Sequence, residues 1–548
     1  MSQSEAIQEI PAGGFASPPD SETPPTGSID ENLNLDAGQV GVLLISIAIV
    51  ALCGIAYELI IGTVSSYLLG NSVYQFSLTI GLFMFAMGIG SYLSKWLMRD
   101  LVTNFVLVEI IISLVGGATS MILFLSFPLV MALYQVIMYS LILIIGSLVG
   151  LEIPLLTRII SRRDSLRYSI AHVLSLDYIG ALIGSVSFPL ILLPFLGLIR
   201  SSFAIGLLNI GIAIINVFVF RKYLRYPRLM GALAVSTAVM LIAAMVGGSR
   251  LTSFAEQFLY SDQIVFSKQT PYQRIILTRS LQDGDYRLYL DGHIQFSQRD
   301  EYRYHESLVH PVMSFEGSRE QVLILGGGDG MAARELLKYE DVAEIHLVDI
   351  DPEMTRLCRE QPTLRALNGG ALNDPRVKVF NQDAFTFVRQ PGIQYDRVII
   401  DLPDPHNEAL NKLYAREFYT MLEARMKPDG YLVSQSSSPY FTRKSYWCIA
   451  ETMKAAGFHL YSYHATVPSF SIWGFHIATP RGPIQPPEDI EVPTRYMTGD
   501  MLRTGSVFPR DMGPLEVPVN TIMHPKLYHF YMQELRAPVS ERAEALQF

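Results

Sequence analysis

The stretch QVLILGGGDG, residues 321–330, decides the fold of this 548-residue chain. Its apolar run is typical of a buried strand and leads directly into glycines, after which the helix-forming stretch MAARELLKY follows at residues 331–339. Glycines allow a tight turn and a close approach of the backbone to a ligand, and a helix N-terminus offers free N–H groups. Strand, glycine turn and helix in this order predict a Rossmann-like α/β domain.

Three further apolar strands end in acidic residues. EIHLVDI carries Asp349, VKVFNQD ends with Asp383, and DRVIIDLPD carries Asp401 and Asp404. Ligands of open α/β sheets bind at the carboxyl ends of the strands, where all of these acids fall. A carboxylate placed like Asp349 typically accepts hydrogen bonds from both ribose hydroxyls, so the ordered set predicts a nucleoside site.

The fourth residue of the glycine turn GGGDG is acidic. Asp329 stands where a phosphate would otherwise approach, and its carboxylate would repel a pyrophosphate but attract an amine or a sulfonium. This position favours an adenosyl-sulfonium donor over NAD or FAD. The simpler alternative is that Asp329 caps the helix that follows.

A small β region precedes the glycine turn. Residues 272–280 (YQRIILTRS) and 286–290 (YRLYL) are β-rich, and Asp283-Gly284 between them is typical of a hairpin. We therefore expect a β-rich part at residues 262–315, followed at residues 316–548 by the Rossmann-like domain with a C-terminal extension.

The N-terminal half has a different composition. Residues 1–38 are rich in Pro, Gly, Ser and acids and lack Lys and Arg, which predicts a disordered acidic tail rather than a signal peptide. Residues 39–248 hold long apolar runs and predict an all-α, multi-span membrane domain of about seven helices. The predicted spans are residues 39–62, 74–94, 104–126, 128–151, 174–196, 201–220 and 229–248.

Basic residues mark alternate loops of this domain, which the positive-inside rule places in the cytoplasm together with the N-terminus. Seven spans would then leave the α/β domain outside, whereas a nucleoside substrate is made inside. We expect a multi-pass protein of the cell (inner) membrane, and the sequence leaves the side of the α/β domain open. The basic residues are Lys95, Arg99, Arg158, Arg162, Arg163, Arg167, Arg221, Lys222, Arg225 and Arg228.

Four acids lie within the apolar runs with no obvious basic partner: Glu58, Glu109, Glu152 and Asp177. Acids in a membrane are costly and often line a polar path, which suggests a cation or proton route. The alternative is that they lie at interfaces, or are protonated and hydrogen-bonded between helices.

Charge and cysteine content exclude other classes. The net charge of −9 and the absence of a basic stripe in the soluble half argue against a nucleic-acid partner. The three cysteines are isolated, so neither a disulfide framework nor a metal site is expected.

The chain carries LDGHIQFSQRDEYRYHE (residues 290–306), LILGGGDG and the strands that end in acidic residues. In these features it resembles the spermidine synthase family of polyamine aminopropyltransferases. The apolar half resembles that of its multi-pass, membrane-fused bacterial members. The resemblance implies transfer of an aminopropyl group from decarboxylated S-adenosylmethionine to a diamine, with putrescine giving spermidine. It implies no cofactor or metal, because the donor leaves as neutral methylthioadenosine, and it suggests a homo-oligomer by analogy.

The resemblance also implies roles for nine residues. Gln273 would contact the donor nucleoside, Asp349 its ribose, and Asp383 with Ala384 its adenine. Asp329 would bind the amine of the aminopropyl arm, while Tyr304 and His305 would line the polyamine channel. Asp401 would accept the proton of the attacking amine, and Asp404 would bind the acceptor.

The chain departs from the family pattern on the acceptor side. Leu402 and Pro403 stand where relatives carry a small polar pair, Phe470 stands where many carry a tyrosine, and His305 stands where many carry glutamine. Acceptor identity is therefore less certain than donor identity. Two other readings stay open: a methyltransferase, and a polyamine transporter or sensor whose soluble domain only binds.

Overall fold

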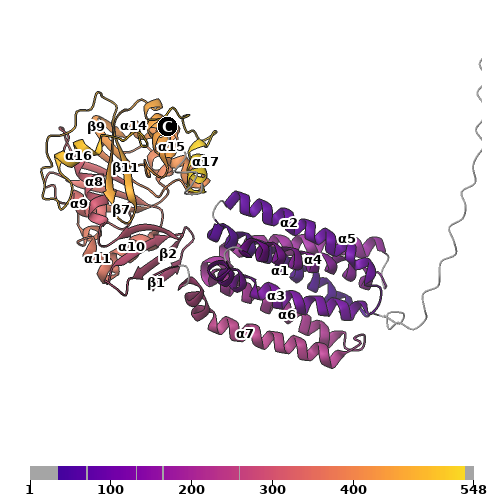
Figure 1. Cartoon of the computed structure of the whole chain (residues 1–548). Coiled ribbons are helices and arrows are strands. Elements are labelled where there is room, and N and C mark those ends of the chain that lie inside the picture. Colours follow the sequence, from indigo (N-terminus) through magenta and orange to yellow (C-terminus); the bar gives the residue numbers. More distant parts are fainter. Residues whose placement is uncertain (1–34, 70–71, 131–132, 163–165, 258–259, 537–548) are drawn as a thin grey trace, which may run out of the picture.

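The structure, a computed structural model, describes residues 35–536 except 70–71, 131–132, 163–165 and 258–259. It consists of a helical bundle followed by an α/β domain (Figure 1). The predicted acidic tail lies outside the described residues up to residue 34. The first helix begins at Ala37, where the Asp36 carboxylate accepts a hydrogen bond from the Gln39 N–H (2.7 Å) as an N-cap.

Six helical segments of the described residues are long and apolar enough to cross a membrane. The longest, residues 169–219, covers two predicted spans and is broken at Gly197, whose φ of +70° is left-handed. The bundle is formed by α1 (Ala37–Leu69), α2 (Ser72–Leu93), α3 (Leu101–Leu129), α4 (Tyr134–Ile160), α5 (Leu166–Ser187), α6 (Leu193–Val219) and α7 (Pro227–Gln257), with the short helices η2 (Ser94–Trp96) and η4 (Phe188–Leu192).

Glycines bring the helices of the bundle into close contact. A Cβ at Gly150 of α4 would lie 2.1 Å from the Met87 carbonyl oxygen of α2. A Cβ at Gly180 of α5 would lie 2.0 Å from the Ala48 carbonyl oxygen of α1. Small residues at such contacts are what apolar helices use to pack in a membrane, where no hydrophobic effect drives their association.

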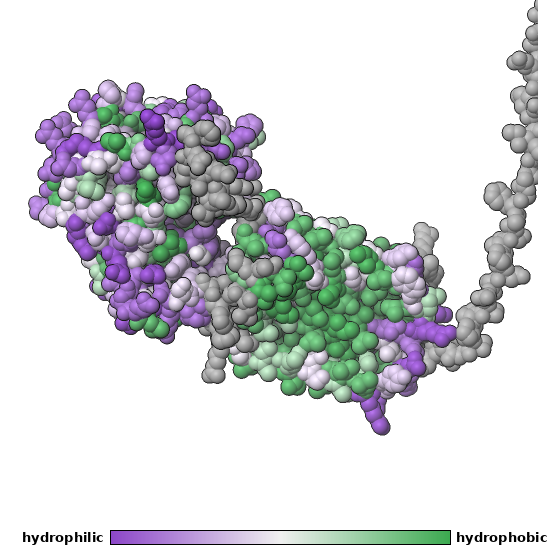
Figure 2. All heavy atoms as spheres, in the orientation of Figure 1, coloured by the Kyte–Doolittle hydropathy of each residue, from purple (hydrophilic) through white to green (hydrophobic). Residues whose placement is uncertain are grey.

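The outer surface of the bundle is apolar. On the face seen in Figure 2 the bundle is largely hydrophobic, with hydrophilic residues on the α/β domain and at the opposite end of the bundle. Phe195, Phe218 and Val246 are each more than three-quarters exposed, at 78%, 77% and 79%. A continuous apolar surface of this kind is suited to lipid.

A four-stranded antiparallel sheet begins the α/β domain, in the order β1-β2-β3-β4. The predicted hairpin joins β2 to β3, and Gly284 in its turn has a φ of +73°. The strands are β1 (Gln263–Gln269), β2 (Arg274–Arg279), β3 (Tyr286–Leu290) and β4 (His293–Ser297), and α8 (Glu301–Met313) follows them.

The main sheet has seven strands in the order β10-β11-β9-β8-β5-β6-β7. Strands β5 to β9 are parallel, whereas β10 and β11 are antiparallel. The chain builds β5, β6 and β7 in one direction and then adds β8 and β9 on the other side of β5. The carboxyl ends of β5 and β8 therefore form the switch point where such sheets bind ligands.

The remaining elements, in chain order, are β5 (Gln321–Gly326), α9 (Met331–Leu336), β6 (Glu344–Asp349), α10 (Pro352–Glu360), α11 (Pro362–Leu367), η5 (Ala371–Asn373), β7 (Val377–Asn381), α12 (Ala384–Arg389), β8 (Tyr395–Asp401), α13 (Glu408–Asn411), η6 (Lys412–Tyr414), α14 (Arg416–Glu423), β9 (Met426–Gln435), α15 (Arg443–Ala455), β10 (His459–Val467), β11 (Ser471–Thr479), α16 (Gly499–Gly505) and α17 (Lys526–Arg536).

Candidate active site

The glycine turn after β5 brings three strand ends into contact. Gly326 has a φ of +86°, and a Cβ there would lie 2.0 Å from the Asp401 carbonyl oxygen. A Cβ at Gly328 would lie 2.4 Å from Asp349 Oδ2. Only glycine allows this approach, which gathers the acids of β6 and β8 around one point.

A single cavity of about 510 Å³ opens at this point and is lined by all nine residues predicted from the sequence. Its walls come from the β3–β4 turn, the start of α8, the glycine turn, and the ends of β6 and β8. The nine residues are Gln273, Tyr304, His305, Asp329, Asp349, Asp383, Ala384, Asp401 and Asp404.

Asp349 is held at the end of β6 by backbone donors. Its Oδ2 accepts a hydrogen bond from Gly328 N–H (3.1 Å) and its Oδ1 accepts one from Asp351 N–H (2.8 Å). Burial raises the pKa of Asp349 to about 7, despite these donors. Each carboxylate oxygen keeps a second lone pair, which gives the two acceptors that a ribose diol requires.

Gln273 is connected to the region of Asp349 through the buried residue Asp351. Its Nε2 donates to Asp351 Oδ2 (3.0 Å), and Asp351 also accepts from Thr270 Oγ1 (2.8 Å) and caps α10 at Glu353 N–H. The small β sheet is thereby tied to the nucleoside end of the cavity.

Asp383 serves as the N-cap of α12. Its Oδ1 accepts from Thr386 N–H (2.8 Å), and its Oδ2 forms an ion pair with Lys412 (2.8 Å). Ala384 is the first residue of the helix and is buried. The predicted adenine contact therefore falls on a carboxylate that already has two partners and on backbone groups at a helix start.

Asp401, Asp329 and His305 form a compact charged cluster. One ligand atom from each lies within 4.8 Å of the other two. The Tyr304 hydroxyl donates to Asp401 Oδ1 (2.7 Å), and His305 Nε2 lies 3.9 Å from Asp329 Oδ2. Burial and the charge of Asp329 raise the pKa of Asp401 to about 6, against the lowering effects of His305 and Tyr304.

His305 carries a proton in this cluster. Burial alone would lower its pKa, but the hydrogen bond to Glu301 and the charges of Asp329 and Glu301 raise it to about 9. Its Nδ1 donates to Glu301 Oε2 (2.8 Å) at the opposite edge of the ring. Two carboxylates and one imidazolium leave the cluster with a net charge of −1, which favours a cationic ligand.

Asp329 also contacts the start of α9, although the N-cap residue of that helix is Gly330. Asp329 Oδ1 accepts from Met331 N–H (2.9 Å) at the start of α9. The other oxygen faces His305 and the cavity. One carboxylate thus orders the glycine turn and presents charge to a ligand.

Asp404 has partners that sequence reasoning missed. Its Oδ1 accepts from Ser437 Oγ (2.7 Å), and its Oδ2 accepts from the Tyr531 hydroxyl (2.8 Å). Tyr531 lies on α17, 127 residues further along the chain. No local motif marks it, because only the tertiary fold brings the C-terminal helix to the end of β8.

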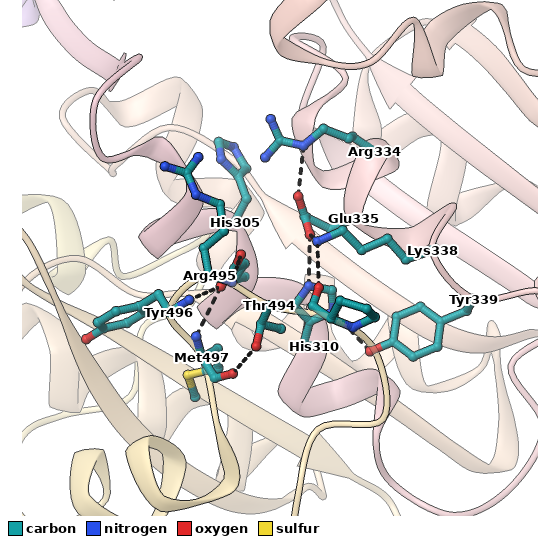
Figure 3. Close-up of polar contacts among 12 residues, drawn as sticks. His305, His310, Arg334, Glu335, Lys338, Tyr339, Thr494, Arg495, Tyr496 and Met497 are labelled. Carbon is teal, nitrogen blue, oxygen red and sulfur yellow. Dashed lines mark hydrogen bonds and ion pairs between the residues drawn. The ribbon is translucent and has the colours of Figure 1, made fainter.

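The helix that carries Tyr304 and His305 is fixed by a buried polar network. His310 on α8 lies between Glu335 (2.8 Å) and the Tyr339 hydroxyl (3.0 Å) (Figure 3). The backbone N–H groups of Arg495, Tyr496 and Met497 all donate to the carboxylate of Glu306. These contacts hold α8 from both sides and so position the cavity end of the helix.

Comparisons with known proteins agree with this geometry. Residues 301–483 match the family model described as the spermine/spermidine synthase domain. A "Polyamine aminopropyltransferase" of Leptospira interrogans is 43% identical over 492 residues, covering 90% of this chain and 98% of the relative. The chain belongs to the polyamine aminopropyltransferase family.

Further relatives extend over both halves of the chain. "Polyamine aminopropyltransferase 1" of Ralstonia nicotianae is 42% identical over 520 residues, covering 93% of this chain and 98% of the relative. A crystal structure of spermidine synthase with the transition-state analogue AdoDATO aligns with 45% of this chain and 84% of its own, at 25% identity and a TM-score of 0.40. The sequence alignments with the two aminopropyltransferases, at 90% and 93% of this chain, extend over the apolar half as well.

The residues that depart from the family pattern all line the cavity: Leu402, Pro403, Phe470 and His305. Phe470 contacts Tyr304 edge-on, with ring centroids 5.9 Å apart, and packs against Trp473. His406 lines the cavity and stacks on His293 with centroids 4.5 Å apart. The end of the pocket that these rings line is therefore aromatic, and burial lowers the pKa of His406 to about 4 and keeps it neutral.

Proposed function

We propose that the α/β domain transfers the aminopropyl group of decarboxylated S-adenosylmethionine to a diamine, and that putrescine is the acceptor that gives spermidine. The charged cluster of Asp401, Asp329 and His305, adjoining the ribose acid Asp349, carries this proposal. It places cation-binding groups beside a nucleoside site, as an adenosyl-sulfonium donor requires.

The transfer is a direct displacement. The lone pair of the acceptor nitrogen attacks the aminopropyl carbon bonded to the sulfonium, the C–S bond breaks, and its electron pair returns to sulfur as neutral methylthioadenosine. Asp401 accepts the proton of the attacking nitrogen. A carboxylate whose pKa is raised to about 6 is a better base than an ordinary one, and its bond to Tyr304 fixes its direction.

The cluster also supports choice of the decarboxylated donor. The ammonium of the aminopropyl arm is attracted by Asp329, whereas the carboxylate of S-adenosylmethionine would be repelled by it. This is the observation that disfavours the methyltransferase reading. Because the donor leaves as a neutral thioether, we propose that the cluster binds organic cations and that the reaction requires no metal or cofactor.

Asp404 is proposed to bind the distal ammonium of the acceptor. It is half-buried at the aromatic end of the cavity, three residues beyond Asp401. Two carboxylates in this order suit a molecule with an amine at each end. The test is a panel of linear diamines of increasing length: putrescine should give the highest kcat/KM, and a clear preference for a longer or a branched amine would contradict this acceptor.

Tyr531 should tune this acceptor site. In the Tyr531→Phe variant Asp404 loses one of its donors but keeps Ser437 and Gln435. Loss of one hydrogen bond of about 1 kcal/mol should raise the KM for the diamine about 5-fold. The donor KM should stay constant. Steady-state kinetics with each substrate varied in turn check this, and Tyr528→Phe on the same helix, outside the cavity lining, is the matched control.

The pH profile should report on Asp401. Its carboxylate form accepts the proton, so kcat/KM should fall as the pH drops through about 6 and should be restored above it. The His305 cation lowers the pKa of Asp401. In His305→Gln, the acid limb of the profile should therefore move to higher pH. An unmoved limb in this variant would show that the titrating group is not Asp401.

We propose that the bundle resides in a lipid bilayer as a multi-pass domain. Its apolar outer surface supports this, as does Lys95, which lies over the Tyr92 ring (3.6 Å) at the end of α2 in the manner of an interfacial anchor. The exposed Arg221 and Arg225 precede α7, whereas the α/β domain follows its far end. Labelling of an Asp341→Cys variant in intact cells by an impermeant maleimide measures on which side that domain lies.

A further inference from the structure

We propose that the bundle contains its own binding site for an ammonium group, built around Glu109 of α3 and Glu152 of α4. The catalytic cavity lies in the other domain and uses neither residue. The identity of the ligand as an amine rests on the proposed function, because the adjoining domain then handles polyamines.

The two carboxyl groups face each other in the core of the bundle. Glu109 is 0% exposed and Glu152 is 1% exposed, and their side chains lie within hydrogen-bonding reach of each other. All four carboxyl oxygens lack a hydrogen bond of good geometry among the described residues, although the Asn209 side chain lies close to the Glu109 carboxyl. Two adjacent carboxylates in an apolar interior cannot both be charged unless a cation lies between them.

Two further buried groups lack partners beside this pair. The Tyr57 hydroxyl and Asn209 Oδ1 have no hydrogen-bond partner among the described residues, although both side chains are 0% exposed. The Asn209 amide donates to the Glu109 carbonyl oxygen (3.3 Å) and to Ser113 Oγ (3.1 Å), and the same side chain lies near the Glu109 carboxyl. Tyr57 lies close enough for the charges of both glutamates to act on its hydroxyl.

One ammonium group accounts for the unpaired groups together, whereas a single shared proton does not. A proton between Glu109 and Glu152 would satisfy the two carboxyls but leave the Asn209 oxygen without a donor. An ammonium group has several N–H donors and a positive charge, so it can satisfy the carboxyls and the amide oxygen together. Four helices supply these groups, as expected of a built site rather than a chance pair.

The depth of the site is consistent with a membrane cation site. Glu109 lies eight residues after the start of α3 and Glu152 lies eight residues before the end of α4, so both are about 12 Å from the same end of the bundle. Asp177 of α5 is half-buried and near enough for its charge to act on Glu152. Asp177 therefore lies nearer the surface of the bundle, and Glu152 and Glu109 lie in its core.

Binding of labelled spermidine to full-length protein in lipid nanodiscs tests the proposal. The catalytic cavity is disabled with Asp401→Asn and Asp404→Asn, and this background should still bind one amine per chain. Adding Glu109→Gln or Glu152→Gln should weaken this binding about tenfold or more. Glu58→Gln, the same change in the same bundle away from the pair, should leave it intact.

Three results would overturn the proposal: no amine bound by the background, binding unchanged by both glutamine substitutions, or a site that sodium ions alone fill while spermidine has no effect. Correct folding is checked separately, because Glu109→Gln and Glu152→Gln with an intact catalytic cavity should retain aminopropyl transfer. That transfer assay also separates the two proposals. If the unaltered protein does not transfer an aminopropyl group, the proposed function is wrong. If the Asp401→Asn, Asp404→Asn protein binds no amine, only the proposed site in the bundle is wrong.

Discussion

Replacing Asp401 by asparagine should lower kcat for aminopropyl transfer by between about 10²- and 10⁴-fold, the usual contribution of a positioned proton acceptor. Asparagine keeps the shape of the side chain and can still accept the Tyr304 hydrogen bond, but it cannot take the proton of the attacking amine. The acceptor would then reach the donor as an ammonium, which has no lone pair for the attack. Formation of methylthioadenosine under saturating substrates measures the effect.

Two controls make this result specific. Affinity for methylthioadenosine, measured by calorimetry, should change little in Asp401→Asn, because the proposed nucleoside contacts lie on β6 and the β7–α12 junction. Asp429→Asn, at an exposed position in β9, should retain full activity. Retention of more than about a tenth of kcat in Asp401→Asn would mean that another group accepts the proton.

Replacing Asp349 by alanine should lower kcat/KM for the donor by about 10²- to 10⁴-fold. Its two oxygens are placed to accept both ribose hydroxyls, and hydrogen bonds to a charged group contribute about 1.5–3 kcal/mol each. The loss should appear in the donor KM and in the dissociation constant of methylthioadenosine. The KM of the diamine should remain close to that of the unaltered enzyme.

Asp341→Ala provides the comparison for this variant. Asp341 is an exposed acid of the same domain, outside the cavity, whose side chain pairs with Arg319. The Asp341→Ala variant should bind methylthioadenosine as tightly as the unaltered protein does. If Asp349→Ala binds the nucleoside as tightly as Asp341→Ala does, the ribose assignment is wrong, whatever happens to turnover.

The sequence allowed prediction of the part of the fold that local patterns specify. Glycines after an apolar strand and acids at strand ends mark the switch point of the sheet, and the apolar runs mark the bundle helices. The break at Gly197 falls between the predicted spans 174–196 and 201–220, but its left-handed φ could not be read from the sequence. The predicted number of about seven spans is reached only when the segment of residues 169–219 is counted as two.

The acceptor side of the site was less predictable because its residues come from distant segments. Asp404 was marked by its place after β8, but its hydroxyl partner Tyr531 arrives on the last described helix. The stacking of His406 on His293 joins the loop after β8 to β4 and follows from tertiary packing alone. In the bundle, the four unpaired acids could be listed from the sequence, but the pairing of Glu109 with Glu152 could not.

The most direct test of the account is the product balance of the purified full-length protein with decarboxylated S-adenosylmethionine and putrescine. The account predicts spermidine and methylthioadenosine in equal amounts, with no turnover when S-adenosylmethionine replaces its decarboxylated form. A methylated product from S-adenosylmethionine, or tight nucleoside binding without any aminopropylated amine, would contradict it.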